Sequence, residues 1–222
     1  MNTICISLGG SIIFKDGSYN IKYLKGFSYL INKHKESKFL IVTGGGSISR
    51  MLIQSAKSII NNNYALDEIG IMITRVNAIV VSELIKGAKL VDSIDSARNV
   101  LLNSNVAVIG GLLPGITTDS VAVLLCEALK GKVLINVSSN SYIYSKNPKY
   151  KDSKPIKNGS YDMLISRSDA EDLRMPGTNF VFDSIASKLA KRSSIIIKFV
   201  DESLEELEKV LEGKNHNGTT IK

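Results

Sequence analysis

Residues 106–119 read VAVIGGLLPGITTD, and this stretch decides the fold class. Its first four residues are apolar and have the length of a buried strand, and a glycine pair ends them. Thr118 and Asp119 can then cap a helix over 118–129, in which apolar residues recur at intervals of three and four. A strand that runs through a glycine turn into a capped helix is the repeating unit of α/β proteins.

The same alternation of strand and helix patterns extends along the whole chain. Short apolar runs predict further strands at 3–8, 39–43, 133–137 and 195–199. Helical periodicity predicts further helices at 23–34, 47–61, 70–85, 93–102, 183–191 and 202–211. We therefore predict an α/β protein with a mainly parallel sheet that helices cover on both faces. The polar segment 138–163 is expected to be a long surface loop or hairpin, and 218–221 a closing edge strand.

The composition suits one large domain or two closely packed lobes, since the chain has 222 residues and 44% of them are hydrophobic. No apolar run approaches the roughly 20 residues that span a bilayer, so no membrane association is expected. The net charge of +7 permits polyanionic ligands. However, the lysines are scattered, and the dense patch at 146–157 has no ladder of aromatic residues. Nucleic acid is therefore not expected as the main partner, and small phosphorylated ligands fit the charge better.

Cys5 and Cys126 both lie in apolar stretches and show no CxxC spacing. Such a pair suits buried thiols in a reducing compartment better than a disulfide framework. The two cysteines and the two histidines, His34 and His216, lack the spacing of zinc ligands, so no metal-binding residue is expected. The stretch Met1–Ser11 has no basic region and no cleavage site, so it is expected to be a first strand rather than a signal peptide. We therefore expect a cytoplasmic protein.

Three of the predicted strands end in glycine-bearing turns. These turns are Ser7–Ser11, Thr43–Ser47 and Gly110–Asp119. Ligands of parallel sheets bind at the carboxyl ends of the strands, where glycine lets the backbone approach an anion and the next helix offers free N–H groups. Together the three turns predict a site for a long, polyphosphate-sized anion. The GxxxxGK[ST] pattern of P-loop proteins is absent, and Ser49 replaces the third glycine of a dinucleotide-binding turn.

Charged residues near these turns indicate how an anion is bound. Arg50 falls one turn into the helix after the triple glycine, where its guanidinium either reaches phosphate oxygens or stays solvated. Asp67 and Asp119 lie at or near predicted helix starts, for which capping is the simpler interpretation. No Ser-His-Asp or Cys-His arrangement is apparent, which argues against most hydrolase mechanisms.

In this order, the segments of the chain resemble the amino-acid-kinase family and, within it, the archaeal-type UMP kinases. The most specific pieces are Thr74–Ala78, which reads TRVNA, and Gly110–Asp119, which reads GGLLPGITTD. Further pieces that resemble the family are Gly9–Ser11, Gly44–Gly46 with Arg50, Asp67, Phe182–Lys188 and His216–Ile221. The resemblance covers nearly the whole chain.

The resemblance implies a three-layer α/β/α sandwich with a mainly parallel central sheet. It implies a single domain over 1–222, with the acceptor nucleotide in the lobe 1–130 and ATP in the lobe 131–222. The expected reaction moves the γ-phosphate of ATP to UMP, giving UDP and ADP, with Mg²⁺ as a cofactor. Members of this kind are commonly hexamers, so a homohexamer is expected.

The resemblance also assigns roles to individual residues. Residues expected to bind UMP are Gly44, Asp67, Leu112, Leu113, Pro114, Gly115, Ile116, Thr117 and Thr118. Residues expected around ATP are Gly9, Gly10, Gly45, Arg50, Ser138, Tyr144 and Asn147. Arg50 and Asp183 are the candidate catalytic residues. Asp183 would organise the metal or a cationic side chain, or it would simply cap a helix.

Four positions depart from the usual pattern of the family, and one of them is Tyr142, which stands where a glycine is usual. Ser141 and Asn147 stand where aspartates are usual, and Ser7 stands where many members have a lysine. These changes affect the expected ATP side and leave the acceptor side intact. Two alternatives therefore stay open: a sibling kinase with another small acceptor, and a catalytically weakened sensor that binds a nucleotide.

Overall fold

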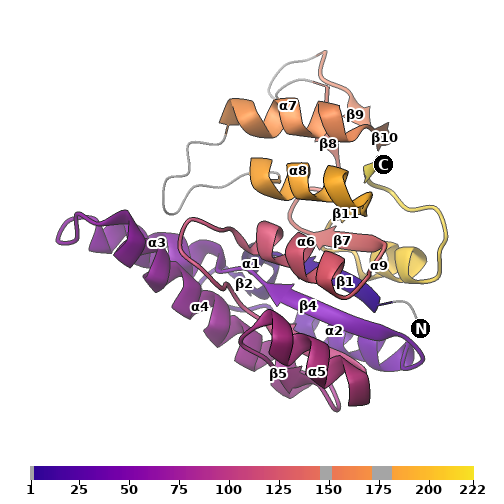
Figure 1. Cartoon of the computed structure of the whole chain (residues 1–222), viewed down its shortest axis with the longest axis horizontal. Helices are drawn as coiled ribbons and strands as arrows, with labels where there is room; N and C mark the ends of the chain where they lie inside the picture. The colour runs from indigo at the N-terminus through magenta and orange to yellow at the C-terminus, as the bar shows by residue number, and fades with distance from the viewer. Residues whose placement is uncertain (1–2, 146–151, 172–181) are drawn as a thin grey trace.

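The computed structural model describes residues 3–145, 152–171 and 182–222. Their centre is an eight-stranded sheet with the order β10-β12-β11-β7-β1-β4-β6-β5 (Figure 1). Among its strand pairings, only that of β11 with β12 is antiparallel. The strands are β1 (Thr3–Leu8), β4 (Lys38–Thr43), β5 (Lys89–Leu90), β6 (Val106–Ile109), β7 (Val133–Val137), β10 (Asn158–Gly159), β11 (Ile196–Val200) and β12 (Thr220–Ile221).

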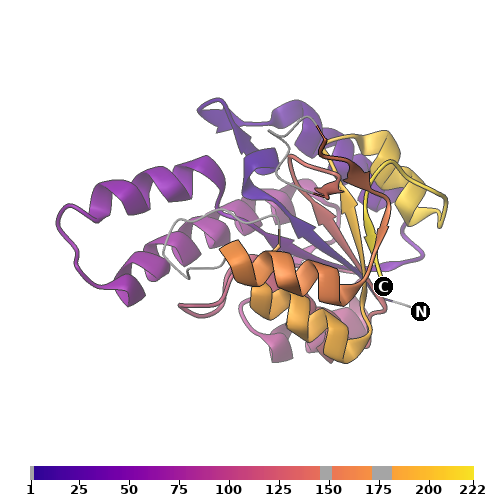
Figure 2. The ribbon, with the colours of Figure 1, turned by 90° about the horizontal axis from the view of Figure 1, so that it is seen from above.

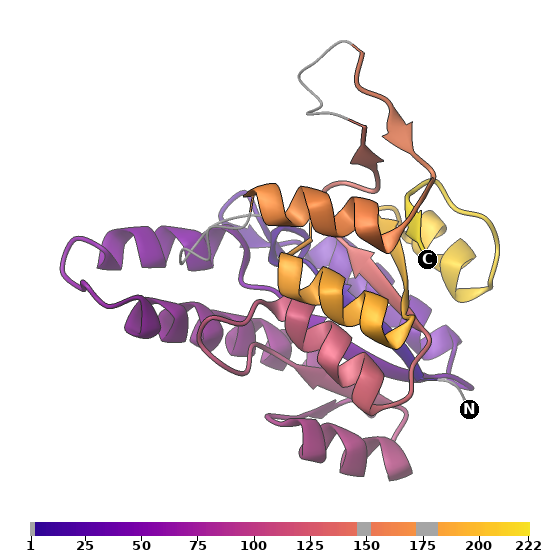
Figure 3. The same ribbon diagram turned by 45° about the horizontal axis from the view of Figure 1, so that its top comes forward.

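Helices cover both faces of this sheet, as Figures 2 and 3 show from two further directions. One face carries α5 (Ile94–Asn103), α6 (Thr118–Ala128) and α8 (Ser184–Ser193), with α7 (Tyr161–Glu171) against α8. The other face carries α2 (Ile21–Lys33), α4 (Asn63–Leu84) and α9 (Leu204–Leu211). The predicted α/β class, its three layers and the mainly parallel sheet are confirmed. Within the described ranges, no helix is both long enough and apolar enough to cross a membrane.

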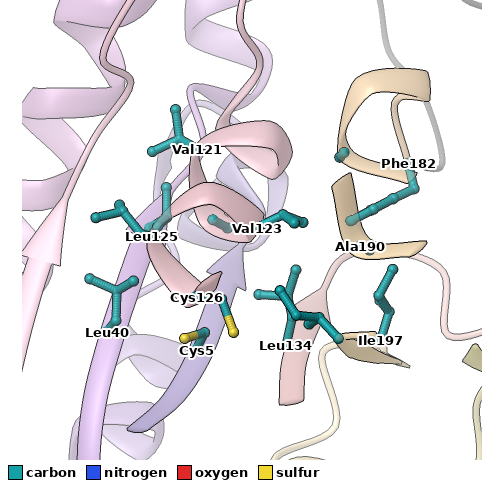
Figure 4. Close-up of a cluster of buried hydrophobic side chains, with 14 of the residues drawn as sticks. Cys5, Leu40, Val121, Val123, Leu125, Cys126, Leu134, Phe182, Ala190 and Ile197 are labelled. Carbon is teal, nitrogen blue, oxygen red and sulfur yellow. The ribbon is translucent and has the colours of Figure 1, made fainter. Parts of the chain in front are cut away.

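Side chains along each central strand point alternately to the two faces of the sheet, and this gives the molecule two separate cores. In β4, Phe39 and Ile41 pack towards α2 and α4, whereas Leu40 and Val42 pack towards α5 and α6. Figure 4 shows part of the second core, in which Cys5 and Cys126 lie side by side. Both thiols are free and fully buried, as predicted. Each large apolar side chain buried in these cores stabilises the fold by about 1.5–3 kcal/mol.

Strand bounds agree with the sequence prediction more closely than helix bounds do. The strands at 3–8, 106–109 and 133–137 are found as predicted. The helix expected from residue 70 begins instead at Asn63, because the side chain of Asn62 accepts a hydrogen bond from the backbone N–H of Tyr64 and caps the helix there. The preceding helix, α3 (Gly46–Ala56), ends five residues before the expected position.

The polar segment after β7 has more structure than a loop. A short hairpin of β8 (Ile143–Tyr144) and β9 (Pro155–Ile156) confirms the hairpin alternative, and β10 follows it. Helix α7 was not predicted. The closing strand β12 is present, but it is not an edge strand, because β10 pairs with its outer side. Two short elements, α1 (Gly10–Ile13) and the β2–β3 hairpin (Phe14–Lys15 and Ser18–Tyr19), were also missed.

Candidate functional site

The three glycine turns lie side by side at one edge of the sheet. They follow β1, β4 and β6, which are neighbours and parallel, so their carboxyl ends point the same way. After β1, the strands β4 and β6 are added on one side of β1. The strands β7 and β11, which come later in the chain, lie on its other side. The direction of winding therefore changes between β1 and β7, which is where open α/β sheets bind ligands. The backbone N–H of Gly9 donates to the carbonyl oxygen of Val137 at 2.8 Å across this point.

The first two turns touch each other through backbone atoms alone. A Cβ atom on Gly10 would lie 2.1 Å from the backbone nitrogen of Gly46 and 2.7 Å from the carbonyl carbon of Gly44. Gly46 itself has φ of +69°, a conformation that favours glycine. No side chain caps the first turn of α3, so its amide groups stay available to an anion. The two turns therefore form a compact surface of backbone suited to phosphate oxygens.

Helix α4 ties the second and third turns together. The side-chain amide of Asn77 donates to the carbonyl oxygen of Gly44 at 2.8 Å. The hydroxyl oxygen of Thr74 accepts from the backbone N–H of Gly111 at 2.6 Å, and its own proton goes to the carbonyl oxygen of Ile71. The hydroxyl of Thr43 donates to the Thr74 carbonyl oxygen at 2.8 Å. These buried contacts explain why the TRVNA motif accompanies the glycine turns: it fixes their positions.

The loop from Leu112 to Thr118 closes back onto α4. Asp67 accepts a hydrogen bond from the backbone N–H of Gly115 at 2.8 Å, at a position where φ is +76°. Asp67 lies inside α4, so the interpretation of this residue as a cap near a helix start is wrong. Leu113 and Gly115 are exposed, while the other five residues of this loop are half-buried. The structure therefore brings Asp67 and the loop together.

Two carboxylates lie beneath the site, at the starts of α6 and α8. The Oδ1 atom of Asp119 accepts from the Ser7 hydroxyl at 2.7 Å and from the Asn136 side-chain amide at 2.9 Å. Ser7 and Asn136 are paired residues of β1 and β7. Asp183 is fully buried and accepts from the Ser120 hydroxyl at 2.9 Å and from the hydroxyl of Thr117. It also accepts from the backbone N–H of Ala186 at 3.0 Å and so caps α8.

Burial and the neighbouring carboxylate change the acidity of Asp119. Burial and, after it, the negative charge of Asp183 raise the pKa of Asp119 from its ordinary value of 3.8 to about 7. The hydrogen bonds from Ser7 and Asn136 act in the opposite direction, because they stabilise the charged form. A carboxyl group that titrates near neutrality in a cleft is a feature of functional sites.

Asp119 should make the stability of the ligand-free protein depend on pH. The folded chain keeps this proton up to about pH 7, while the unfolded chain releases it near pH 3.8. Since the folded state binds more protons in this window, the free energy of unfolding falls as the pH rises through it. In Asp119→Asn a neutral amide stays in place and its oxygen can still accept both hydrogen bonds. We expect this variant to be more stable than the native protein at about pH 8, by at most about 4 kcal/mol.

Urea unfolding at about pH 5 and about pH 8 measures this effect. The matched control is Asp95→Asn, which removes an exposed carboxylate from the first turn of α5. Asp95→Asn should follow the native pH dependence. Equal losses of stability with pH in Asp119→Asn and in the native protein would contradict the assignment.

The remaining predicted residues are placed as follows. Arg50 is half-buried on α3, and its side chain makes no ion pair or hydrogen bond with any other described residue. The backbone N–H of Ser138 donates to the carbonyl oxygen of Val200 at 3.0 Å, which holds Ser138 just past the end of β7. Tyr144 is half-buried in β8. Ser138 and Tyr144 both follow β7 in the chain and lie on the β7 side of Gly9. Asn147 lies outside the described residues.

Sequence reasoning missed several residues that organise the site. Ser7 was noted only as a departure from the family pattern, and Asn136 and Ser120 were not singled out. Each is a buried polar residue at the end of an otherwise apolar strand or in the first turn of a helix. A polar residue at such a position was the available signal, because buried polar groups need partners.

The fold and the arrangement of these turns define the class of the protein. Residues 2–200 match the amino acid kinase family, and the chain belongs to that family.

Its particular relatives are uridylate kinases. The chain is 37% identical over 222 residues to the uridylate kinase of Thermoplasma volcanium, covering 99% of this chain and 97% of the relative. It is 35% identical to that of Thermoplasma acidophilum, covering 99% and 96%. The crystal structure of uridylate kinase from Archaeoglobus fulgidus superposes with a TM-score of 0.87 and 30% identity, covering all of both chains. The resemblance to archaeal-type UMP kinases is therefore confirmed.

Proposed function

We propose that the chain is a UMP kinase that moves the γ-phosphate of ATP to UMP, giving UDP and ADP. The observation that carries this proposal is the continuous backbone surface of Gly9, Gly10 and Gly44–Gly46, with Arg50 one turn into α3 and the Gly110–Asp119 loop beside it. The similarity to uridylate kinases along nearly the whole chain supports it. Neither a sibling acceptor nor a sensor role is favoured by these relatives.

The donor and acceptor nucleotides would lie on opposite sides of β1. ATP would bind over 131–222, with its phosphates on Gly9, Gly10 and Gly45. Its nucleoside would lie near Ser138, Tyr144 and Asn147. UMP would bind over 1–130, between Gly44, Asp67 and the loop 112–118. The change in winding direction between β1 and β7 supports this division.

The residues present suit the polyphosphate of ATP. A Cβ on Gly9 would lie 2.8 Å from the carbonyl oxygen of Val137, so glycine is needed where the β1 turn approaches the end of β7. The first amides of α3 lack a side-chain cap, and Arg50 lacks an anionic partner among the described residues. Five N–H donors in a planar group allow Arg50 to bind two phosphate oxygens at once. Charge and geometry therefore both match a phosphate chain.

The chemistry follows from this arrangement. An oxygen of the UMP phosphate attacks the γ-phosphorus of ATP, and the bond from that phosphorus to the ADP oxygen breaks. The attacking phosphate is already anionic, so no strong general base is needed, and positioning and charge stabilisation supply the catalysis. Mg²⁺, when bound with ATP, supplies positive charge against the phosphates, and it usually keeps several water ligands. Asp119 would help to hold the ion, since its Oδ2 atom has no hydrogen-bond partner among the described residues.

Asp183 acts through other residues in this proposal. It holds the hydroxyls of Thr117 and Ser120 at the start of α6, and it holds the backbone of α8. Its negative charge also keeps the pKa of Asp119 high. Asp183 therefore positions the loop that would wrap UMP, and it tunes the carboxyl group nearest to the phosphates.

A coupled assay of ADP release tests the proposal, using ATP, Mg²⁺ and a panel of UMP, CMP, dTMP, AMP and GMP. We expect strong turnover with UMP. Turnover with another nucleotide of the panel, and none with UMP, would show that this other nucleotide is the acceptor. UMP binding without turnover on any acceptor would instead indicate a nucleotide sensor and reject the kinase.

A homo-oligomer, with a hexamer as the expected form, is supported by the helical arm of α3 and α4. Figure 2 shows this arm extending beyond the edge of the sheet. It exposes a series of large apolar side chains that a monomer would leave in water. These are Met51, Leu52, Ile59, Tyr64, Met72, Val76 and Ile79, and Ile59 is 85% exposed.

Ile59→Glu should therefore lower the oligomeric state. A charge placed in an apolar contact loses hydration without gaining a partner, which disfavours association. Light scattering coupled to gel filtration measures the mass against the 24.2 kDa chain. Leu102→Glu, on the exposed side of α5 at 73% exposure, is the matched control and should keep the native mass. Equal masses for all three proteins would rule out this arm as the interface.

A further inference from the structure

A cluster of potential metal ligands lies away from the nucleotide site, where α2 and α9 pack on the same face of the sheet (Figure 2). A ring nitrogen of His34 and one carboxylate oxygen each from Glu208 and Glu212 lie within 4.8 Å of one another. His34 is the residue that ends α2, and Glu212 is the residue that ends α9. Glu208 is one turn before Glu212, so the two carboxylates share a face of α9.

The histidine carries the second observation. Its Nε2 atom is buried and has no hydrogen-bond partner among the described residues. Buried polar atoms in proteins nearly always have a partner, and an exception calls for a ligand, an ion or water. A metal ion bound at Nε2 would supply that partner.

The backbone around the cluster favours a cation. The carboxyl ends of two helices meet there, and each carries a partial negative charge. The end of α9 is held rigidly, because the N–H of Lys214 donates to the carbonyl oxygen of Lys209 at 2.8 Å and Gly213 follows with φ of +72°. This turn fixes the backbone from which the Glu212 carboxylate extends.

Two lysines form ion pairs with carboxylates of this cluster. Lys33 pairs with Glu208 at 2.5 Å, and Lys214 pairs with Glu212 at 2.6 Å. About half or more of each lysine side chain is exposed, and exposed pairs of this kind contribute little to stability. A divalent ion can therefore displace both ammonium groups at small cost.

We propose that His34, Glu208 and Glu212 bind a divalent transition metal of the zinc type, which links α2 to α9. One nitrogen and two oxygen ligands suit Zn²⁺, and the imidazole disfavours Mg²⁺ and Ca²⁺, which prefer oxygen. Water would complete the coordination. The site is separate from the nucleotide site, so it does not depend on the proposed kinase activity.

Zn²⁺ binding to the full, nucleotide-free chain tests the proposal, by competition with a chromogenic chelator. We expect one equivalent of Zn²⁺ to bind and a large excess of Mg²⁺ to leave it bound. His34→Gln and Glu208→Gln should each weaken binding at least about tenfold, since each removes one of the few ligands. Glu205→Gln removes the same charge from an exposed position on the same helix and should bind as the native chain does.

Two further results distinguish a defined coordination site from nonspecific electrostatic binding of Zn²⁺ to negative charge. Lys33→Ala should bind Zn²⁺ more tightly than the native chain, because it removes the competing ammonium group. Zn²⁺ should also raise the Tm of the native chain and leave that of His34→Gln unchanged. Equal Zn²⁺ affinity in the native chain and His34→Gln would overturn the proposal, and so would equal losses in Glu208→Gln and Glu205→Gln.

Discussion

Arg50→Ala is expected to lower kcat/KM for UMP phosphorylation by a factor on the order of 10²–10³. Arg50 lies one turn into α3, after the uncapped residues Gly45 and Gly46, and its side chain has no ion pair among the described residues. A half-buried cation without an anion is available to the transferred phosphoryl group, where negative charge spreads in the transition state. Since this side chain makes no hydrogen bond or ion pair with the described residues, stability towards urea should change little.

Two further variants make the Arg50 experiment specific. Arg50→Lys keeps the charge but loses the planar pair of donors, so it should recover only part of the lost activity. Arg98→Ala removes an exposed arginine from α5, whose partner is Asp95, and should keep native kinetics. A loss confined to KM for ATP would indicate ground-state binding alone. Turnover within about threefold of native in Arg50→Ala would remove Arg50 from the catalytic residues.

The strands, and the glycine turns at their ends, were predictable from the sequence because they depend on local patterns. The apolar runs at 106–109 and 133–137 are buried on both sides, so their bounds follow from composition alone. The glycine turns follow β1, β4 and β6 directly. In a parallel sheet, the ends of neighbouring strands meet at one edge, so the turns were expected to lie together.

The partners of the site residues were not predictable, since they depend on contacts between distant segments. Ser7 and Asn136 are far apart in sequence, and only the register of β1 with β7 places both beneath Asp119. Asp67 could be placed wrongly because helix α4 starts seven residues earlier than its apolar pattern. Its first turn, Asn63–Leu66, contains a single buried apolar residue, Leu66, so no repeating pattern marks that start.

Gly10→Ala is expected to destabilise the fold by about 3 kcal/mol or more and to abolish nucleotide binding. The added Cβ would lie 2.1 Å from the backbone nitrogen of Gly46, 2.5 Å from the carbonyl carbon of Gly45 and 2.7 Å from that of Gly44. All three atoms are backbone, so no side-chain rotation can relieve the overlap. The β1 turn must move away from the β4 turn, and the hydrogen bond from Gly44 N–H to the Leu8 carbonyl oxygen, 2.9 Å long, must stretch with it.

Gly70→Ala is the matched control for this effect. Its added Cβ would meet only side-chain atoms, the Ile53 Cδ1 atom at 3.2 Å and the Ser49 hydroxyl oxygen at 3.4 Å. Alanine also favours the helical interior over glycine by about 1 kcal/mol, so Gly70→Ala should be close to native in stability. Urea unfolding and UMP titration compare the three proteins. If Gly10→Ala keeps native stability and native UMP affinity, the two turns can separate freely, and a fixed backbone surface for phosphate is the wrong description of the site. If it folds less stably yet still binds UMP, contact between the turns matters for the fold, and the acceptor is held by Asp67 and the loop 112–118 instead.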